Sequence, residues 1–267
     1  MYKITDGGIY QENIAILKAY TDDYYKIVGF RSVKVAGVDG YASYKREKVD
    51  EGRFDESISR ARSAIHEIVM CNDFEYFVTM TLDKRHHDRY DLDVFRKRLA
   101  KWINNYNTKE GVNIKYLLIP ERHKDGAYHC HGFLADVPGD HLYRYGVNSR
   151  LPYAMLKLIK QGRALYNWPA YAKAFGFVSL EKIKDKERAA RYVMKYVSKE
   201  LGSVDAGANK HLYYCSKGLN RSREVWRGEL TKVLEPDFKN EYVSVKTVDS
   251  FEAGISYFTE RVDGEGW

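Results

Sequence analysis

The sequence has few cysteines and no long uncharged apolar run. Its three cysteines, Cys71, Cys130 and Cys215, form no C-x-x-C pair, so the sequence indicates neither a disulfide framework nor a cysteine zinc site. No uncharged run reaches the length of a membrane-spanning helix, and the first residues do not resemble a secretion signal. We therefore expect a soluble protein in a reducing compartment, the cytoplasm.

Internal repeats and low-complexity linkers are also missing, and the 267 residues include only five prolines. We expect one globular domain with extensions at both ends. The 44 Lys and Arg exceed the 37 Asp and Glu, and the resulting charge of +7 favours an anionic partner, although such a charge also serves solubility alone. The 23 tyrosines favour a nucleic acid, because aromatic rings can stack on bases beside phosphate contacts.

Hydrophobic spacing predicts alternating helices and strands along the central part of the chain. Helices are expected at 55–70, 91–106, 153–161 and 186–201, the last with Asp185 as N-cap, and strands at 24–35, 74–82, 114–121, 127–135, 175–183 and 211–216. The turn chemistry of Lys124-Asp125-Gly126 predicts that two of these strands form an antiparallel hairpin. Strands joined by hairpins as well as by helices predict an α+β fold, with a central, mainly antiparallel sheet and flanking helices.

The second strand of this hairpin contains two histidines at a spacing typical of a metal site. His129 and His131 are two residues apart, so both side chains point to one face of the strand and Cys130 points to the other. By itself this spacing is more often a pair of half-buried strand residues. The carboxylate of Glu121 on the first strand would complete a set of one oxygen and two imidazole ligands, suited to Mn²⁺, Mg²⁺ or Zn²⁺.

Whether Glu121 joins the histidines depends on the length of the hairpin loop. A three-residue loop with Gly126 in the left-handed region places Glu121 opposite His129, on the same face. A two-residue Asp-Gly turn instead pairs Glu121 with Cys130 and directs the carboxylate to the other face. The sequence leaves both alternatives open.

The helix expected at 186–201 carries two tyrosines one turn apart. Tyr192 and Tyr196 fall on its apolar stripe, and tyrosines there usually pack in a core with the hydroxyl hydrogen-bonded. Lys195 and Lys199 each follow a tyrosine by three residues, which brings an ammonium near each phenol. A phenol with a pKa near 10 needs such help to act as a nucleophile at neutral pH. The lysines could equally belong to a solvated basic flank.

Taken in order, these segments resemble the HUH endonuclease superfamily, in particular the rolling-circle replication initiators of single-stranded DNA phages and plasmids. Phe77–Leu82 resembles the first motif, a strand of F-x-T-L-T type, and His129–His131 the second. Glu121 lies where several such families carry an acidic ligand. Tyr192–Lys199 resembles the third motif in its two-tyrosine form, known from gene A type initiators, and Tyr213–Leu219 a segment that follows it in related proteins.

The resemblance implies an HUH/RRM-like nickase fold and a tyrosine-nucleophile DNA nickase in a bacterial host cell. Glu121, His129 and His131 would hold Mg²⁺ or Mn²⁺. Tyr192 and Tyr196, assisted by Lys195 and Lys199, would alternate in cutting and rejoining single-stranded DNA at a replication origin through a 5′-phosphotyrosine, with Tyr192 cutting first. The sequence has no Walker-type phosphate loop, so a host or separate helicase would be needed, together with a DNA polymerase.

The resemblance covers the middle of the chain. We expect an N-terminal extension at 1–50, an endonuclease domain at 51–220 and a C-terminal tail at 221–267. The alternatives are a relaxase or a single-strand transposase of the same superfamily, a non-catalytic nucleic-acid-binding protein, and a metal-dependent phosphoesterase that uses water. The order of the motifs argues against relaxases, which commonly place the nucleophile before the histidines. A covalent adduct with DNA would exclude the last two alternatives.

Overall fold

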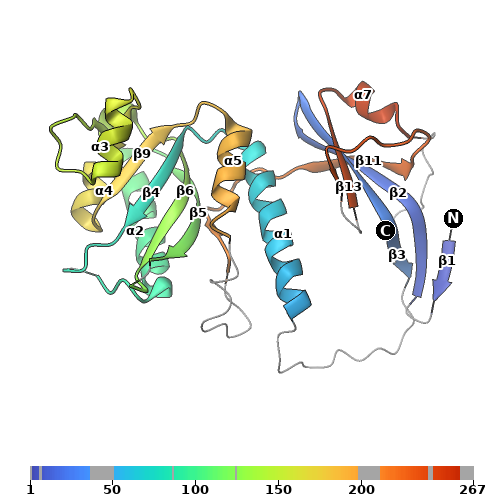
Figure 1. The fold of residues 1–267 in the computed structure, drawn as a ribbon, viewed down its shortest axis with the longest axis horizontal. Coiled ribbons are helices and arrows are strands. Elements are labelled where there is room, and N and C mark those ends of the chain that lie inside the picture. Colours follow the sequence, from blue (N-terminus) through green and yellow to red (C-terminus); the bar gives the residue numbers. More distant parts are fainter. Residues whose placement is uncertain are drawn as a thin grey trace. The chain divides into compact units, whose positions relative to one another are not determined.

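The computed structural model describes residues 2–5, 8–36, 51–85, 87–123, 125–197, 211–239 and 243–258. The chain divides into two compact units. One is Lys48–Asn220, and the other combines the two ends of the chain, Met1–Glu47 and Arg221–Trp267. Each unit contains one β-sheet with helices packed on it (Figure 1). None of the helices in the described part combines the length and hydrophobicity needed to cross a membrane.

The sheet of the Lys48–Asn220 unit has seven strands, and all neighbouring strands in it are antiparallel. Their order across the sheet is β10-β5-β6-β4-β9-β8-β7. The strands are β4 (Tyr76–Thr81), β5 (Lys115–Arg122), β6 (Tyr128–Ala135), β7 (Tyr143–Arg144), β8 (Leu165–Asn167), β9 (Val178–Lys182) and β10 (Tyr214–Cys215). This arrangement confirms the expected α+β class with a mainly antiparallel sheet.

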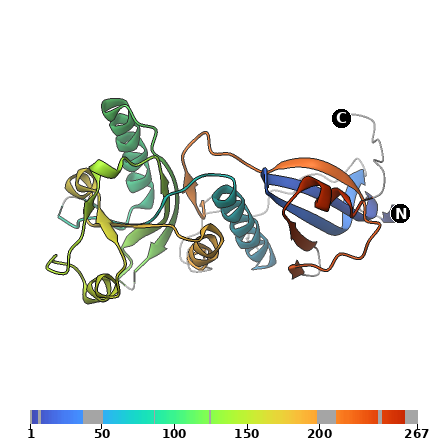
Figure 2. The same ribbon diagram turned by 90° about the horizontal axis from the view of Figure 1, so that it is seen from above.

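Helices cover both faces of this sheet. The helical elements are α1 (Glu51–Met70), α2 (Leu92–Glu110), the 3-10 turn Gly139–His141, α3 (Tyr153–Lys160), α4 (Pro169–Ala174) and α5 (Lys186–Met194). Residues of α2 and α4 pack on one face, and residues of α1 and α5 on the other. Figure 2 shows α2 and the pair α1 and α5 on opposite sides of the strands.

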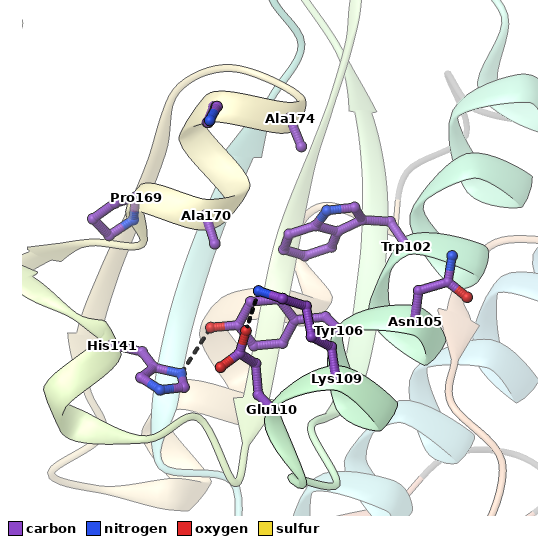
Figure 3. A pocket seen from close by; sticks show the side chains of 10 residues that line it. Trp102, Asn105, Tyr106, Lys109, Glu110, His141, Pro169, Ala170 and Ala174 are labelled. Atoms are coloured by element: carbon purple, nitrogen blue, oxygen red, sulfur yellow. Dashed lines mark hydrogen bonds and ion pairs between the residues drawn. The ribbon is translucent and has the colours of Figure 1, made fainter.

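The face under α2 and α4 is filled by aromatic side chains. Trp168 and Tyr171 are completely buried there, and Trp102 of α2 packs edge-on against both rings. A hollow of about 680 Å³ opens between the two helices, lined by Trp102, Tyr106 and His141 among others (Figure 3). The Tyr106 hydroxyl lies 2.7 Å from Nδ1 of His141 at its floor. This hollow belongs to the sheet face on which Cys130 is buried.

Local signals explain where the helices of this unit begin and end. The side chain of Asp91 accepts a hydrogen bond from the Val94 amide and caps α2, which ends at Gly111 in the left-handed region. Asp185 caps α5 by accepting a bond from the Arg188 amide, as expected. However, α5 ends at Met194, seven residues before the expected end at Leu201. The amides of Tyr196 and Val197 bond three residues back, which tightens the chain into turns. Residues 198–201 lie outside the described part.

The second unit is built from the two ends of the chain. Its strands are β1 (Tyr2–Thr5), β2 (Gly8–Thr21), β3 (Tyr24–Ala36), β11 (Arg223–Glu229), β12 (Phe238–Lys239) and β13 (Val243–Val248), followed by α7 (Phe251–Ile255). They form a six-stranded sheet in the order β1-β2-β3-β13-β12, with β11 also paired to β2. Ala15, Leu17, Ile27 and Phe258 form its core. The segment expected as a C-terminal tail thus supplies three strands and a helix.

Candidate active site

The β5–β6 hairpin has the register that a three-residue loop requires. The His123 amide donates to the Ala127 carbonyl at 2.8 Å, and Gly126 adopts a φ of +82° in the left-handed region. Glu121 is therefore the cross-strand partner of His129. Since paired residues share a face, the carboxylate lies on the same side as both imidazoles.

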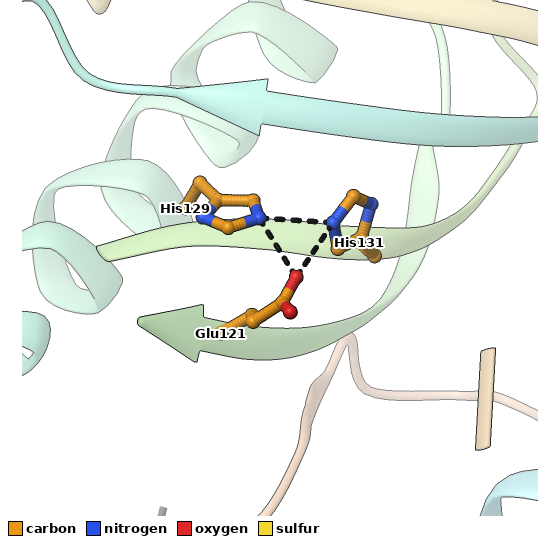
Figure 4. A group of neighbouring side chains, drawn as sticks. All are labelled: Glu121, His129 and His131. Atoms are coloured by element: carbon orange, nitrogen blue, oxygen red, sulfur yellow. Dashed lines mark hydrogen bonds and ion pairs between the residues drawn. The ribbon is translucent and has the colours of Figure 1, made fainter. Parts of the chain in front are cut away.

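Glu121, His129 and His131 converge on one point (Figure 4). Oε2 of Glu121 lies 2.9 Å from Nε2 of His129 and 3.0 Å from Nε2 of His131. The two Nε2 atoms are themselves 2.9 Å apart. A proton on each of these nitrogens would bring two hydrogens into conflict, whereas a cation can accept a lone pair from each nitrogen and from the carboxylate. This donor set fits a divalent metal ion.

Both imidazoles are buried and electrically neutral at physiological pH. Burial lowers the pKa of His129 to about 4, with a smaller effect from the charge of His123. Burial also lowers the pKa of His131 to about 3, assisted by the charges of His129, Lys195 and His123. Neutral imidazole is the form that ligates metals, so protons do not compete for these rings near pH 7.

Two neighbours that the sequence did not single out hold the imidazoles in different ways. Nδ1 of His131 lies 3.1 Å from the Thr79 hydroxyl, on the neighbouring strand β4, where Thr79 is its cross-strand partner. Nδ1 of His129 is buried without a hydrogen-bond partner among the described residues. The ring of His123 instead stacks on the ring of His129, with centroids 3.9 Å apart. Only the pairing register, not the sequence pattern, reveals the role of Thr79.

Both candidate nucleophiles of α5 and the turn after it lie beside the histidines. The Tyr196 ring stacks on the His131 ring, with centroids 3.9 Å apart and planes at 14°. The Tyr196 hydroxyl donates a 2.9 Å hydrogen bond to the Tyr192 hydroxyl. The Tyr192 ring packs edge-on against Phe77 of β4, at 5.5 Å between centroids. The two phenols thus extend outward in a row from the histidines.

The tyrosines are less buried than their place on the expected apolar stripe indicates. The buried side of α5 and the following turn consists of Ala190, Val193 and Val197. Tyr192 is 47% exposed and Tyr196 is half-buried. A side chain at the edge of the packed face keeps its ring in contact with protein while its hydroxyl reaches solvent.

Lys195 contacts both tyrosines. Its Nζ lies 3.6 Å from the Tyr192 ring centroid and 4.8 Å from the Tyr196 centroid. Burial acts to raise the pKa of Tyr192, but hydrogen bonds from Tyr196 and Lys195 and the charges of Lys195 and Arg163 outweigh it, so the pKa falls below its usual value. Burial, the bond to Tyr192 and the Glu121 charge raise the pKa of Tyr196. Lys199 lies outside the described residues.

Residues 75–201 match the model of a family described as replication-associated protein ORF2. The match covers just under half of the chain and includes the Glu121, His129 and His131 cluster and both tyrosines. It supports a role for this chain as a replication initiator. Comparisons with curated proteins and with solved structures give no significant match.

Proposed function

We propose that this protein is a rolling-circle replication initiator that nicks and rejoins single-stranded DNA through a tyrosine nucleophile. The observation that carries the proposal is the arrangement of Tyr196 and Tyr192 beside the Glu121, His129 and His131 cluster. A metal-binding set next to two partly exposed phenols and a lysine has the parts needed to attack a phosphodiester. The family match to residues 75–201 gives the DNA-replication context.

The proposed metal is Mg²⁺ or Mn²⁺, held by Glu121, His129 and His131. Ligands in adjacent positions of an octahedral ion, with bonds of about 2.1 Å, are about 3 Å apart, whereas tetrahedral ligands are spread more widely. The three observed separations are 2.9, 3.0 and 2.9 Å, which favours the octahedral alternative. When bound, the ion would act as a Lewis acid on the scissile phosphate and help to orient it.

The tyrosines supply the covalent chemistry in this proposal. The Tyr192 oxygen attacks phosphorus, a P–O(tyrosine) bond forms and the P–O3′ bond breaks, which leaves a 5′-phosphotyrosine and a 3′-hydroxyl that can prime synthesis. The phenol releases its proton, and the departing 3′ oxygen takes one up. Because the pKa of Tyr192 is lowered, it is the more readily ionised of the pair at neutral pH. Tyr196 acts in the following round.

The remaining parts of the proposal concern the domain and its partners. Residues 51–220 form the endonuclease domain, residues 1–50 and 221–267 are extensions, and the DNA is a single-stranded replication origin in the cytoplasm of a bacterial host. Lys195 neutralises charge on the phosphate or phenolate, and Lys199 is proposed to do the same for the second tyrosine. The chain supplies no Walker-type phosphate loop, so unwinding and synthesis fall to a separate helicase and polymerase.

The test is the capture of DNA as a covalent adduct. The full chain is incubated with Mn²⁺ and a pool of random-sequence single-stranded oligonucleotides labelled at the 3′ end, because that end remains on the fragment joined to tyrosine. A denaturing gel then separates labelled protein from free DNA, and peptide sequencing of the digested adduct identifies the modified residue. We expect an adduct at Tyr192 or Tyr196 that requires the metal.

The matched control is the double variant Tyr192→Phe/Tyr196→Phe, which keeps both rings and removes both hydroxyls. It should form no adduct and still retain the oligonucleotides on a native gel through its basic surface. An adduct formed by this variant would place the nucleophile elsewhere. Cleavage by the wild-type chain without any adduct would instead indicate a phosphoesterase that uses water.

A further inference from the structure

An arginine outside all of the sequence motifs lies beside one of the two tyrosines. Arg163 occupies the turn between α3 and β8, where its amide donates to the Leu158 carbonyl at 3.0 Å. Gly162 precedes it with a φ of +84°, a conformation that favours glycine and fixes the direction of the turn. The Arg163 side chain therefore projects from a defined backbone position just before β8.

Glu181 of β9 orients the Arg163 guanidinium. Nε of Arg163 donates to Oε1 of Glu181 at 2.6 Å, and Nη2 donates to Oε2. This two-point contact fixes the plane of the guanidinium and leaves the N–H groups of Nη1 outside the contact with the carboxylate. The Arg163 side chain remains 45% exposed, so a ligand in solvent can reach it.

The sheet register connects this pair to Tyr192. Glu181 is the cross-strand partner of Phe77, and the Phe77 ring packs against the Tyr192 ring. Arg163 thus lies on the Tyr192 side of the site, whereas Tyr196 stacks on His131. The charges agree with this placement, because Arg163 contributes to lowering the pKa of Tyr192, and Tyr192 contributes to raising the pKa of Arg163.

We propose, resting on the proposed function, that Arg163 is a phosphate-binding residue that serves Tyr192 and not Tyr196. A guanidinium held by one carboxylate can still donate its remaining N–H groups to a phosphodiester oxygen. The phosphate joined to Tyr192 lies between two cations, Lys195 and Arg163, and the phosphate attacked by Tyr196 lies next to His131 and Glu121. The two tyrosines are therefore chemically unequal, although their sequence motifs are equivalent.

This inequality suits a reaction in which one strand waits while the other is cut. A phosphate bound to Tyr192 keeps its positive partners there while Tyr196 attacks the second phosphodiester. In each cut one P–O(tyrosine) bond forms and one P–O3′ bond breaks, with the phenol proton released and the 3′ oxygen protonated. Arg163 exchanges no proton in these steps and acts through its charge and hydrogen bonds alone.

The experiment measures adduct formation in enzymes that retain a single tyrosine. The probe is the 3′-labelled oligonucleotide whose sequence is recovered most often from wild-type adducts, used with Mn²⁺. In the Tyr196→Phe background, where Tyr192 acts, Arg163→Gln should slow adduct formation about ten- to a hundredfold. In the Tyr192→Phe background, where Tyr196 acts, the same substitution should change the rate less than about threefold. Arg163→Lys should give an intermediate rate with Tyr192, because it keeps the charge and loses the fork.

A matched control exists in the other unit, where Arg227 makes a similar two-point contact with Glu224 at 2.7 Å for both bonds. Arg227→Gln removes the same charge and the same kind of ion pair, and should leave both rates unchanged. Equal losses in the two tyrosine backgrounds, no loss in either, or an equal effect of Arg227→Gln would overturn the assignment of Arg163. Failure of the wild-type chain to form any adduct would instead overturn the proposed function itself.

Discussion

The two faces of the seven-stranded sheet use the same strands for opposite purposes. On β6, Cys130 and Leu134 point into the core under α2 and α4, while His129 and His131 point to the face that carries α1 and α5. The first face is filled with aromatic rings such as Trp168 and Tyr171. The second is filled only in part, because the tyrosines at the edge of α5 remain partly exposed.

This difference teaches how a rigid site can remain accessible. The packed face fixes the positions of β4, β5 and β6, so the side chains on the other face are held by strands and not by loops. The face of the site can then carry buried imidazoles and exposed phenols at its edge. Substitutions on the packed face should alter stability, and substitutions on the face of the site should alter metal affinity and reactivity.

The largest effect is expected from Glu121→Gln, which keeps the shape of the side chain and removes its charge. Because the carboxylate is the one anionic donor of the cluster, the affinity for Mn²⁺, measured by electron paramagnetic resonance, should fall more than about a hundredfold. Glu110→Gln is the control, since Glu110 pairs with Lys109 on α2 and borders the hollow on the packed face. Equal affinities of the two variants would remove Glu121 from the metal site.

On the packed face the largest change is expected for Trp168→Ala. Trp168 is completely buried and contacts the rings of Trp102 and Tyr106, so its removal leaves a large cavity. The free energy of unfolding, measured with urea, should fall by about 3–5 kcal/mol. At a temperature where the variant is folded, its affinity for Mn²⁺ should match the wild type. A parallel loss of metal affinity would show that the two faces are not independent.

A pH dependence should arise from the buried imidazoles. The pKa values of His129 and His131 are lowered to about 4 and about 3, below the ordinary value of about 6.5. As the pH falls below 6.5, the unfolded chain takes up protons that the folded chain refuses, so stability is lost. Between pH 7.5 and 5.5, without metal, the free energy of unfolding should fall by on the order of 2 kcal/mol because of these two rings. The double variant His129→Asn/His131→Asn should show a correspondingly smaller fall, and an identical fall would contradict this attribution.

A smaller effect is expected for Thr79→Val, which keeps the side-chain shape and removes the hydroxyl next to Nδ1 of His131. Because this contact orients the imidazole, affinity for Mn²⁺ should fall about tenfold. Thr79→Ser should restore it. Thr81→Val is the control, since the Thr81 hydroxyl donates to the Phe177 carbonyl and not to a histidine. The same loss in both valine variants would indicate a general weakening of β4.

The sequence predicted much of this unit because its signals are local. Alternating side chains placed His129 and His131 on one face, and Asp185 marked the start of α5. The position of Glu121 required the loop conformation around Gly126, which depends on hydrogen bonds across the hairpin. Thr79 and Arg163 are brought to the site by pairing with distant strands, so no local pattern could identify them.

The unit formed by the chain ends shows the limit of local signals more strongly. Strand β2 pairs with β11, more than 200 residues further along the chain, and this pairing has no counterpart in the sequence pattern of either segment. The strand expected at 24–35 is confirmed by β3. The opposite error occurs at the end of α5, where helical spacing continues to Leu201 but the described helix ends at Met194. Side-chain periodicity does not report a change in backbone hydrogen bonding.

The smallest effect should come from the single substitutions Tyr192→Phe and Tyr196→Phe. Each keeps the ring contacts with Phe77 or His131 and removes one partner of the 2.9 Å hydrogen bond between the hydroxyls. The free energy of unfolding should therefore change by no more than about 1 kcal/mol. Urea unfolding without metal measures it. A loss of more than about 3 kcal/mol would make the hydroxyls part of the structural core, and the missing adduct of the double variant would then reflect unfolding. A small loss assigns that missing adduct to the chemistry of the phenols.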